Sequence, residues 1–306
     1  MSSARAQSAV VGELAALGPF FAVEAHPPGA PPGAPWRPLA EVLTSPVLQQ
    51  RIGMVRSALR ERASRDGDDG SGGSDGSGGG VGEDGSRGGG VRGEGSRGGG
   101  GEGEAGRVPG DVELRVAASV TQLGMVARLI APALAAQAAG HQLALPLAGV
   151  WWQDVVGGPV PLSVPAPPAG LAASAGQSAS APPSAGATQA PSAGHPPDPL
   201  VTLLEEVITP ITAVTAGLAP VSPRVLWGNV ASAINGAASQ VARARPDLAT
   251  NAWATAAAVF QYPRLSTEPG PPGPSFRRSS CCLIYRLAPA SRGGAYCGDC
   301  VLRDRR

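Results

Sequence analysis

The residues best suited to chemistry in this chain of 306 residues lie near its C-terminal end. All four cysteines fall there, as Cys281, Cys282, Cys297 and Cys300. A disulfide framework would staple the whole chain and would require export to an oxidising compartment. Clustering of every thiol in one short segment favours metal binding instead.

The spacing of the cysteines limits which metal centre they could hold. Cys297 and Cys300 form a C-x-x-C turn, which aims two sulfurs at one point, and Gly298 is expected to ease that turn. The adjacent pair supplies two more thiolates, and four thiolates satisfy either a Cys₄ zinc ion or a [2Fe–2S] cluster. Neighbouring side chains of an extended chain point apart, so the pair makes a poor zinc knuckle. The residues favour iron–sulfur and leave zinc or unligated thiols open.

The residues around the cysteines carry a resemblance. RSSCCLIYR over 278–286 and CGDCVL over 297–302 resemble the cluster-binding segment of the FhuF family of ferric siderophore reductases, whose pattern is C-C-x₁₀-C-x₂-C. Residues 115–119, 151–159 and 226–233 resemble the helical region of that family. The resemblance covers most of 111–165 and 199–306. The spacer between Cys282 and Cys297 has fourteen residues instead of ten, which indicates a loop insertion at 290–294.

The resemblance implies a function for the chain. It assigns a [2Fe–2S] cluster to the ligands Cys281, Cys282, Cys297 and Cys300, and an enzyme activity that reduces hydroxamate-type ferric siderophores to release iron. Hard oxygen ligands hold Fe³⁺ far better than Fe²⁺, so one added electron loosens the metal. The alternative, from another class, is a non-catalytic interaction protein with a structural Cys₄ zinc site.

Charge indicates which partners to expect. The formal net charge is +1, which gives no reason to expect nucleic acid. Residues 277–306 hold seven arginines and two aspartates, so this tail carries +5 and the remainder about −4. We therefore expect an acidic electron donor, such as a ferredoxin or reduced flavin, to dock on Arg277, Arg278 and Arg286.

We expect no secretory signal in this chain. Its N-terminus lacks a charged start followed by an apolar run. The most apolar stretch, 116–139, is interrupted by Gln122, Arg128 and Pro132, which argues against a membrane span of about 20 apolar residues. We expect a cytoplasmic protein.

The predicted fold class is mainly α with a small β-hairpin (α+β), in which a helical domain precedes the cysteine-ligated segment. Two segments rich in Gly, or in Ala, Pro and Ser, are expected to be disordered linkers. The predicted parts are 1–64 (helical), 65–108 (linker), 109–165 (helix and hairpin), 166–197 (linker), 198–265 (helical) and 275–306 (cluster segment).

Several elements follow from local signals. Asp111, Asp198 and Asn229 are candidate helix caps, and Pro132 should kink or split the helix over 111–140. That helix should bury one face, made of Val112, Val116, Val120, Leu123, Ala127, Ile130 and Leu134. Runs at 150–153 and 160–164 around a Gly-Gly pair predict the hairpin. Trp227 is expected in the core, and His26, His141 and His195 are expected to be solvated.

Overall fold

The computed structural model describes residues 10–68, 111–166, 198–266, 270–287 and 296–303. Most of both predicted linkers, and His195, lie outside these ranges. The described helices comprise a short one over residues 10–16, α2 (Ser45–Asp68), α3 (Leu114–Ala138), α4 (Pro199–Leu203), α5 (Thr209–Leu218), α6 (Pro223–Ala244) and α7 (Ala249–Val259). The prediction of a mainly helical fold with a small β element is confirmed.

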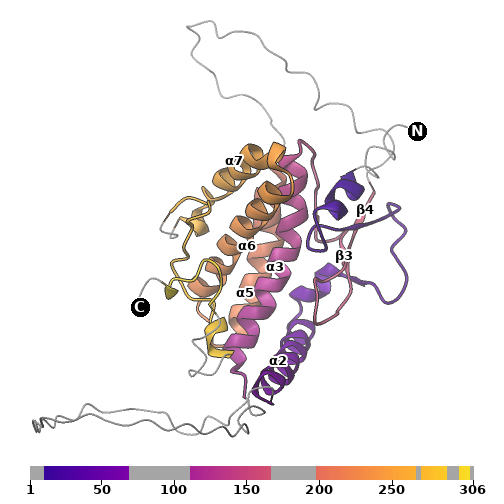
Figure 1. Cartoon of the computed structure of the whole chain (residues 1–306). Helices are drawn as coiled ribbons and strands as arrows, with labels where there is room; N and C mark the ends of the chain where they lie inside the picture. Colours follow the sequence, from indigo (N-terminus) through magenta and orange to yellow (C-terminus); the bar gives the residue numbers. More distant parts are fainter. Residues whose placement is uncertain (1–9, 69–110, 167–197, 267–269, 288–295, 304–306) are drawn as a thin grey trace, which may run out of the picture.

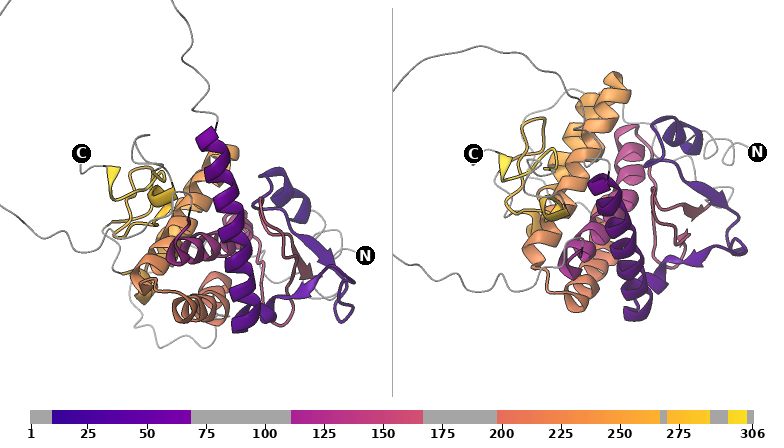
Figure 2. Two further views of the ribbon diagram at one scale, coloured as in Figure 1. Left: turned by 90° about the horizontal axis from the view of Figure 1, so that it is seen from below. Right: turned by 60° about the horizontal axis from the view of Figure 1, so that its bottom comes forward.

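The helices form a bundle around α3 (Figure 1). The most extensive helix contact joins α3 to α6, and α2, α5 and α7 also pack on α3. The strands lie on one side of the bundle, and the C-terminal segment lies on the other side, against α6 (Figure 2). The cysteine segment is therefore supported by helices and makes no part of the sheet.

The predicted hairpin is present as β3 (Trp151–Trp152) and β4 (Leu162–Pro165), which pair antiparallel. Gly157, with φ of +97°, lies between the two strands. The sheet also recruits β1 (Glu24–His26), parallel to β4, and β2 (Arg37–Pro38), antiparallel to β3. The prediction that residues 1–64 are helical is therefore wrong for this part of the chain. The polar edges of a two-stranded hairpin need partners, and the N-terminal segment supplies them.

The sheet corrects one side-chain expectation. His26 was expected to be solvated, but it is buried, and its Nδ1 lies 2.8 Å from the Ser163 hydroxyl on the neighbouring strand. Trp152 is fully buried. On the helical side, Trp227 is buried within α6 against Tyr262, as expected for a core residue.

Helix α3 differs from its predicted form. It runs unbroken through Pro132, so the expected split is wrong. Helices and the sheet surround it, and most of its length is buried, whereas Val120, Leu123 and Ala127 of the predicted inner face are only half-buried. Position in the bundle, rather than the periodic pattern alone, decides which side chains are covered.

By length and composition alone, α3 and the stretch Pro199–Leu218 are apolar enough to cross a membrane. The sequence argument against such a span in α3 was therefore too strict. For α3, 78% of the apolar window is buried inside the protein, which is what a core helix shows.

The predicted caps have different outcomes. The Asp198 carboxylate accepts hydrogen bonds from the amides of Leu200 and Val201, as predicted. One turn later the chain forms a π-turn over Leu204–Ile208, just before Pro210, where a proline cannot donate the helical hydrogen bond. Asn229 caps nothing, because α6 already begins at Pro223 and is capped by Ser222.

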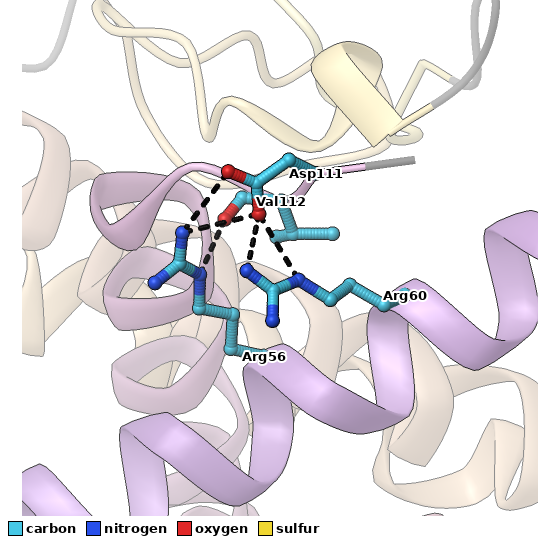
Figure 3. A network of polar contacts seen from close by, with 4 residues as sticks. All are labelled: Arg56, Arg60, Asp111 and Val112. Atoms are coloured by element: carbon cyan, nitrogen blue, oxygen red, sulfur yellow. Dashed lines mark hydrogen bonds and ion pairs between the residues drawn. The ribbon is translucent and has the colours of Figure 1, made fainter. Parts of the chain in front are cut away.

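Asp111 does not cap α3 either. Its carboxylate receives hydrogen bonds from the guanidinium groups of Arg56 and Arg60 on α2, and Arg56 also donates to the carbonyl oxygen of Val112 at 2.6 Å (Figure 3). Hydrogen bonding to Arg60 is the main reason that the pKa of Asp111 is lowered. This cluster ties the start of α3 to α2.

Arg128 fastens α3 to the N-terminal segment and the sheet side. Its guanidinium is 2% exposed and donates to the carbonyl oxygens of Phe20, Ala22 and Val160. Burial lowers its pKa to about 10. A charge that bonds three separate backbone positions of two segments fixes how those segments lie on the helix.

We predict that Arg128→Met lowers the free energy of unfolding by about 2–4 kcal/mol, because it leaves buried carbonyl oxygens without donors. Chemical denaturation would measure this. Arg62→Met, at an exposed position of α2, should change stability by no more than about 0.5 kcal/mol. Equal effects of the two substitutions would contradict the role of Arg128.

Candidate metal centre

The cysteine segment has little regular structure of its own and is held against α3 and α6. Within its described residues, a 3₁₀ turn runs over Ile284–Leu287. The segment packs tightly on α6 at Gly228, where an added Cβ would overlap the Ser280 hydroxyl and lie 3.0 Å from Nη2 of Arg278. The absence of a side chain at this position therefore lets the segment lie on the helix.

A fully buried polar cluster joins the segment to both helices. Asn229 of α6 lies at its centre, with Nδ2 3.0 Å from the Gln122 amide oxygen and 3.1 Å from the Ser119 hydroxyl. The Ser119 hydroxyl in turn donates to the backbone oxygen of Cys282 at 2.9 Å. These contacts fix a cysteine's backbone from residues of α3 and α6.

Arg278 completes this polar cluster. It is 1% exposed, and its Nη2 donates to Oδ1 of Asn229 at 2.7 Å and to the Val225 backbone oxygen at 3.1 Å. Its own amide donates to the backbone oxygen of Asp299 at 3.1 Å. Arg278 therefore connects α6 with both halves of the cysteine motif.

The two halves of the motif meet through Cys282 and Cys297, whose sulfurs are 3.5 Å apart. Two ligands at about 2.3 Å from one tetrahedral ion would be about 3.8 Å apart. Cys282 and Cys300 are buried, and Cys281 and Cys297 are half-buried. The structure thus brings one thiol from each half of the motif to the separation of two ligands on one iron.

Backbone amides point at two further sulfurs. The Leu283 amide donates to Cys281 at 3.3 Å, and the Leu302 amide donates to Cys300 at 3.4 Å. Such bonds stabilise thiolates and help to set cluster potentials. Leu283 achieves this with φ of 70°, a strained left-handed conformation for a leucine. Gly298 shows no positive φ, so the expected role of glycine in the C-x-x-C turn is wrong.

The thiols differ in acidity. Hydrogen bonding with Cys281 and Cys297, with a contribution from the nearby charge of Arg278, lowers the pKa of Cys282. The pKa of Cys281 and that of Cys297 are raised, mainly by hydrogen bonding to Cys282 and also by burial. Cys281 and Cys297 are therefore expected to be protonated before metal binds, and loading the site must release their protons.

The expectation that Arg277, Arg278 and Arg286 dock a partner is wrong for Arg278, which is buried. Arg286 donates to Glu113 on the chain just before α3, with its Nε 2.7 Å from the carboxylate. That bond also raises the pKa of Arg286. Two of these three arginines therefore hold the segment on the bundle.

The donors present are compatible with a [2Fe–2S] cluster, which is held by four cysteine thiolates. Within the described ranges, no three His, Cys, Asp or Glu side chains converge on one ion position. Cys282 and Cys297 lie at the separation of one pair of ligands, and backbone amides donate to the sulfurs of Cys281 and Cys300.

Sequence reasoning placed the cysteines but missed the residues that position them, namely Ser119, Gln122, Gly228, Asn229 and Arg278. A signal was present, because Ser119, Gln122 and Asn229 are polar residues within strongly apolar helical stretches. Polar side chains at such positions are buried only when they are hydrogen-bonded. They therefore mark a place where another segment docks.

We predict that Gly228→Ala displaces the cysteine segment, with an overpacking cost of about 1–3 kcal/mol and a loss of bound metal. Metal content per chain and chemical denaturation would measure both effects. Gly53→Ala, in α2 with nothing within 4 Å of the added Cβ, is the matched control. It should keep full metal content and stabilise the protein by about 0.4–1 kcal/mol. Full metal content in Gly228→Ala would contradict the proposed close packing.

Comparison with known proteins bears on the same segment. Residues 278–302 match the FhuF 2Fe-2S C-terminal domain, and this range contains all four cysteines. Neither a curated protein nor a solved structure matches the chain. The tail therefore matches a FhuF-type C-terminal domain, a domain whose cofactor is a [2Fe–2S] cluster.

Proposed function

We propose that this protein is an iron–sulfur electron-transfer enzyme that reduces ferric siderophores of the hydroxamate type and so releases iron in the cytoplasm. The observation that carries the proposal is the match of residues 278–302, with all four cysteines, to the FhuF 2Fe-2S C-terminal domain. The match to this domain supports an iron–sulfur protein of the siderophore-iron reductase type. The substrate and the compartment are our proposals.

Each part of the centre has a role in this proposal. When bound, a [2Fe–2S] cluster supplies one electron at a time, which is what reduction of Fe³⁺ to Fe²⁺ consumes. Cys281, Cys282, Cys297 and Cys300 hold the cluster in the proposal. Ser119 and Arg278 fix the backbone of the cysteine segment.

We further propose an acidic electron donor, a reduced ferredoxin or flavin, as the source of the electron. The support is the charge of +5 over residues 277–306. Arg278 is buried and Arg286 pairs with Glu113. Among the described arginines of this segment, docking would therefore depend on Arg277, which is half-buried, and on Arg303, which is exposed and follows Cys300. Positive charge at a surface attracts acidic partners, and the attraction weakens as salt is added.

Serine substitution tests the ligand assignment. We predict that each of the four Cys→Ser variants loses the cluster or binds it weakly, because a hard oxygen replaces a soft thiolate. Iron and sulfide content and the visible absorption of anaerobically purified protein would show this. Ser57→Ala, at an exposed position of α2, is the control and should keep the cluster. A Cys→Ser variant with full iron content and an unchanged spectrum would remove that cysteine from the ligand set.

Single-turnover kinetics test the activity. Protein with its cluster reduced by dithionite and then freed of dithionite is mixed with a ferric trihydroxamate and a colour-forming Fe²⁺ chelator. We expect about one Fe²⁺ per cluster, because each cluster holds one electron. The gallium(III) complex of the same chelator, which cannot be reduced, should leave the cluster reduced. Equal rates of cluster oxidation with the iron and gallium complexes would overturn the proposed function.

A further inference from the structure

A groove of about 620 Å³ runs between α3, α6 and the cysteine segment. Cys297, Gly298 and Asp299 form part of its wall, so it adjoins the metal centre. Its volume falls within the range of about 300–1,000 Å³ that is typical of small-molecule sites. A second cavity, of about 660 Å³ between α2, α3 and the hairpin, has no cysteine in its wall.

Two glycines leave free space along the floor of the groove. Gly124 of α3 and Gly236 of α6 line it, and a Cβ added at either position would meet nothing within 4 Å. Glycine within a helix costs about 0.5–1 kcal/mol relative to alanine, and no packing contact requires it here. The half-buried Val120, Leu123 and Ala127 of α3 lie along the same groove, so the apolar face of α3 that the bundle leaves partly open faces this space.

The wall contributed by α6 is polar. Ser239, Gln240 and Arg243 line it and make no side-chain hydrogen bond within the described part of the chain. The Asp299 carboxylate, at the cysteine end, accepts a hydrogen bond from the Ser232 hydroxyl. The groove therefore offers mainly hydrogen-bond donors and positive charge next to an apolar surface.

We propose that this groove binds the ferric siderophore, as a trihydroxamate chelate, with Gly124 and Gly236 leaving room for it and Gln240 and Arg243 contacting its oxygen atoms. This inference rests on the proposed function and names its substrate site. A chelate of this class presents many carbonyl and hydroxamate oxygens on an otherwise apolar body, which matches donors beside an apolar wall. Binding there would bring Fe³⁺ beside Cys297, and a reduced cluster held by the cysteines would supply the one electron that Fe³⁺ takes up, becoming oxidised by one electron itself.

Arg243 could also serve only the stability of α6. It lies in the last turn of that helix, where a positive charge interacts favourably with the helix dipole. Glycines can likewise persist in helices without a ligand. Arg243 and the two helical glycines line the same groove as Cys297, and this common location favours a role in ligand binding over a role in helix stability alone. A protein partner would require a broader and flatter surface than this concavity offers.

The test measures binding separately from electron transfer. The gallium(III) complex of a cyclic trihydroxamate, which has no net charge and cannot be reduced, is titrated into the cluster-loaded full chain by calorimetry. We expect Gly236→Leu, which fills the floor, to weaken binding by about tenfold or more, and Arg243→Gln to weaken it by about three- to tenfold. The KM for the iron complex should rise in parallel, while cluster absorption and reduction by dithionite stay unchanged.

Matched variants outside the groove provide the controls. Gly53→Leu places the same side chain on an open helical glycine of α2, and Arg62→Gln removes an exposed arginine of that helix. Both should bind the gallium complex as the wild type does. Wild-type affinity and KM in Gly236→Leu and Arg243→Gln would overturn the site and leave the proposed function standing. A wild-type chain that neither binds the gallium complex nor reduces the iron complex would overturn both.

Discussion

The hydrogen bonds of Asn229 are the constraint on which the metal centre depends. This fully buried amide meets Ser119 and Gln122 of α3 on one side and Arg278 of the cysteine segment on the other. A buried polar group is tolerable only with partners, so the two helices and the segment are stable together in one arrangement. The segment has almost no secondary structure to fix its own shape. The helices therefore supply the geometry that the cysteines lack.

Elements that are determined by neighbouring residues could be predicted from the sequence. The hairpin around Gly157 and the cap at Asp198 depend on a few neighbouring residues, and both are as predicted. The N-terminal strands were missed because residues 24–26 and 37–38 become strands only by pairing with a hairpin far away in the sequence. Asp111 was misassigned for a related reason, since arginines on another helix compete for the same carboxylate.

The cysteines of the metal centre could be predicted from the sequence, but the residues that position them could not. Thiols at close spacing identify a metal segment whatever the surrounding fold, so the cysteines and their family could be recognised from sequence. Whether an arginine such as Arg278 faces solvent or lies buried depends on long-range packing, which a charge count cannot show. The same limit applies to the groove beside Cys297, because it exists only where two helices and the segment meet.

The contacts of the cysteine segment also bear on the order of biosynthesis. Ser119 and Asn229, which hold it, lie on helices that precede the cysteines along the chain. Synthesis proceeds from the N-terminus, and domains generally fold in that direction. The receiving surface on α3 and α6 can therefore be assembled before the thiols leave the ribosome. Iron and sulfide would then be delivered to ligands already confined on one face, which limits the exposure of reactive thiols to oxidants and competing metals.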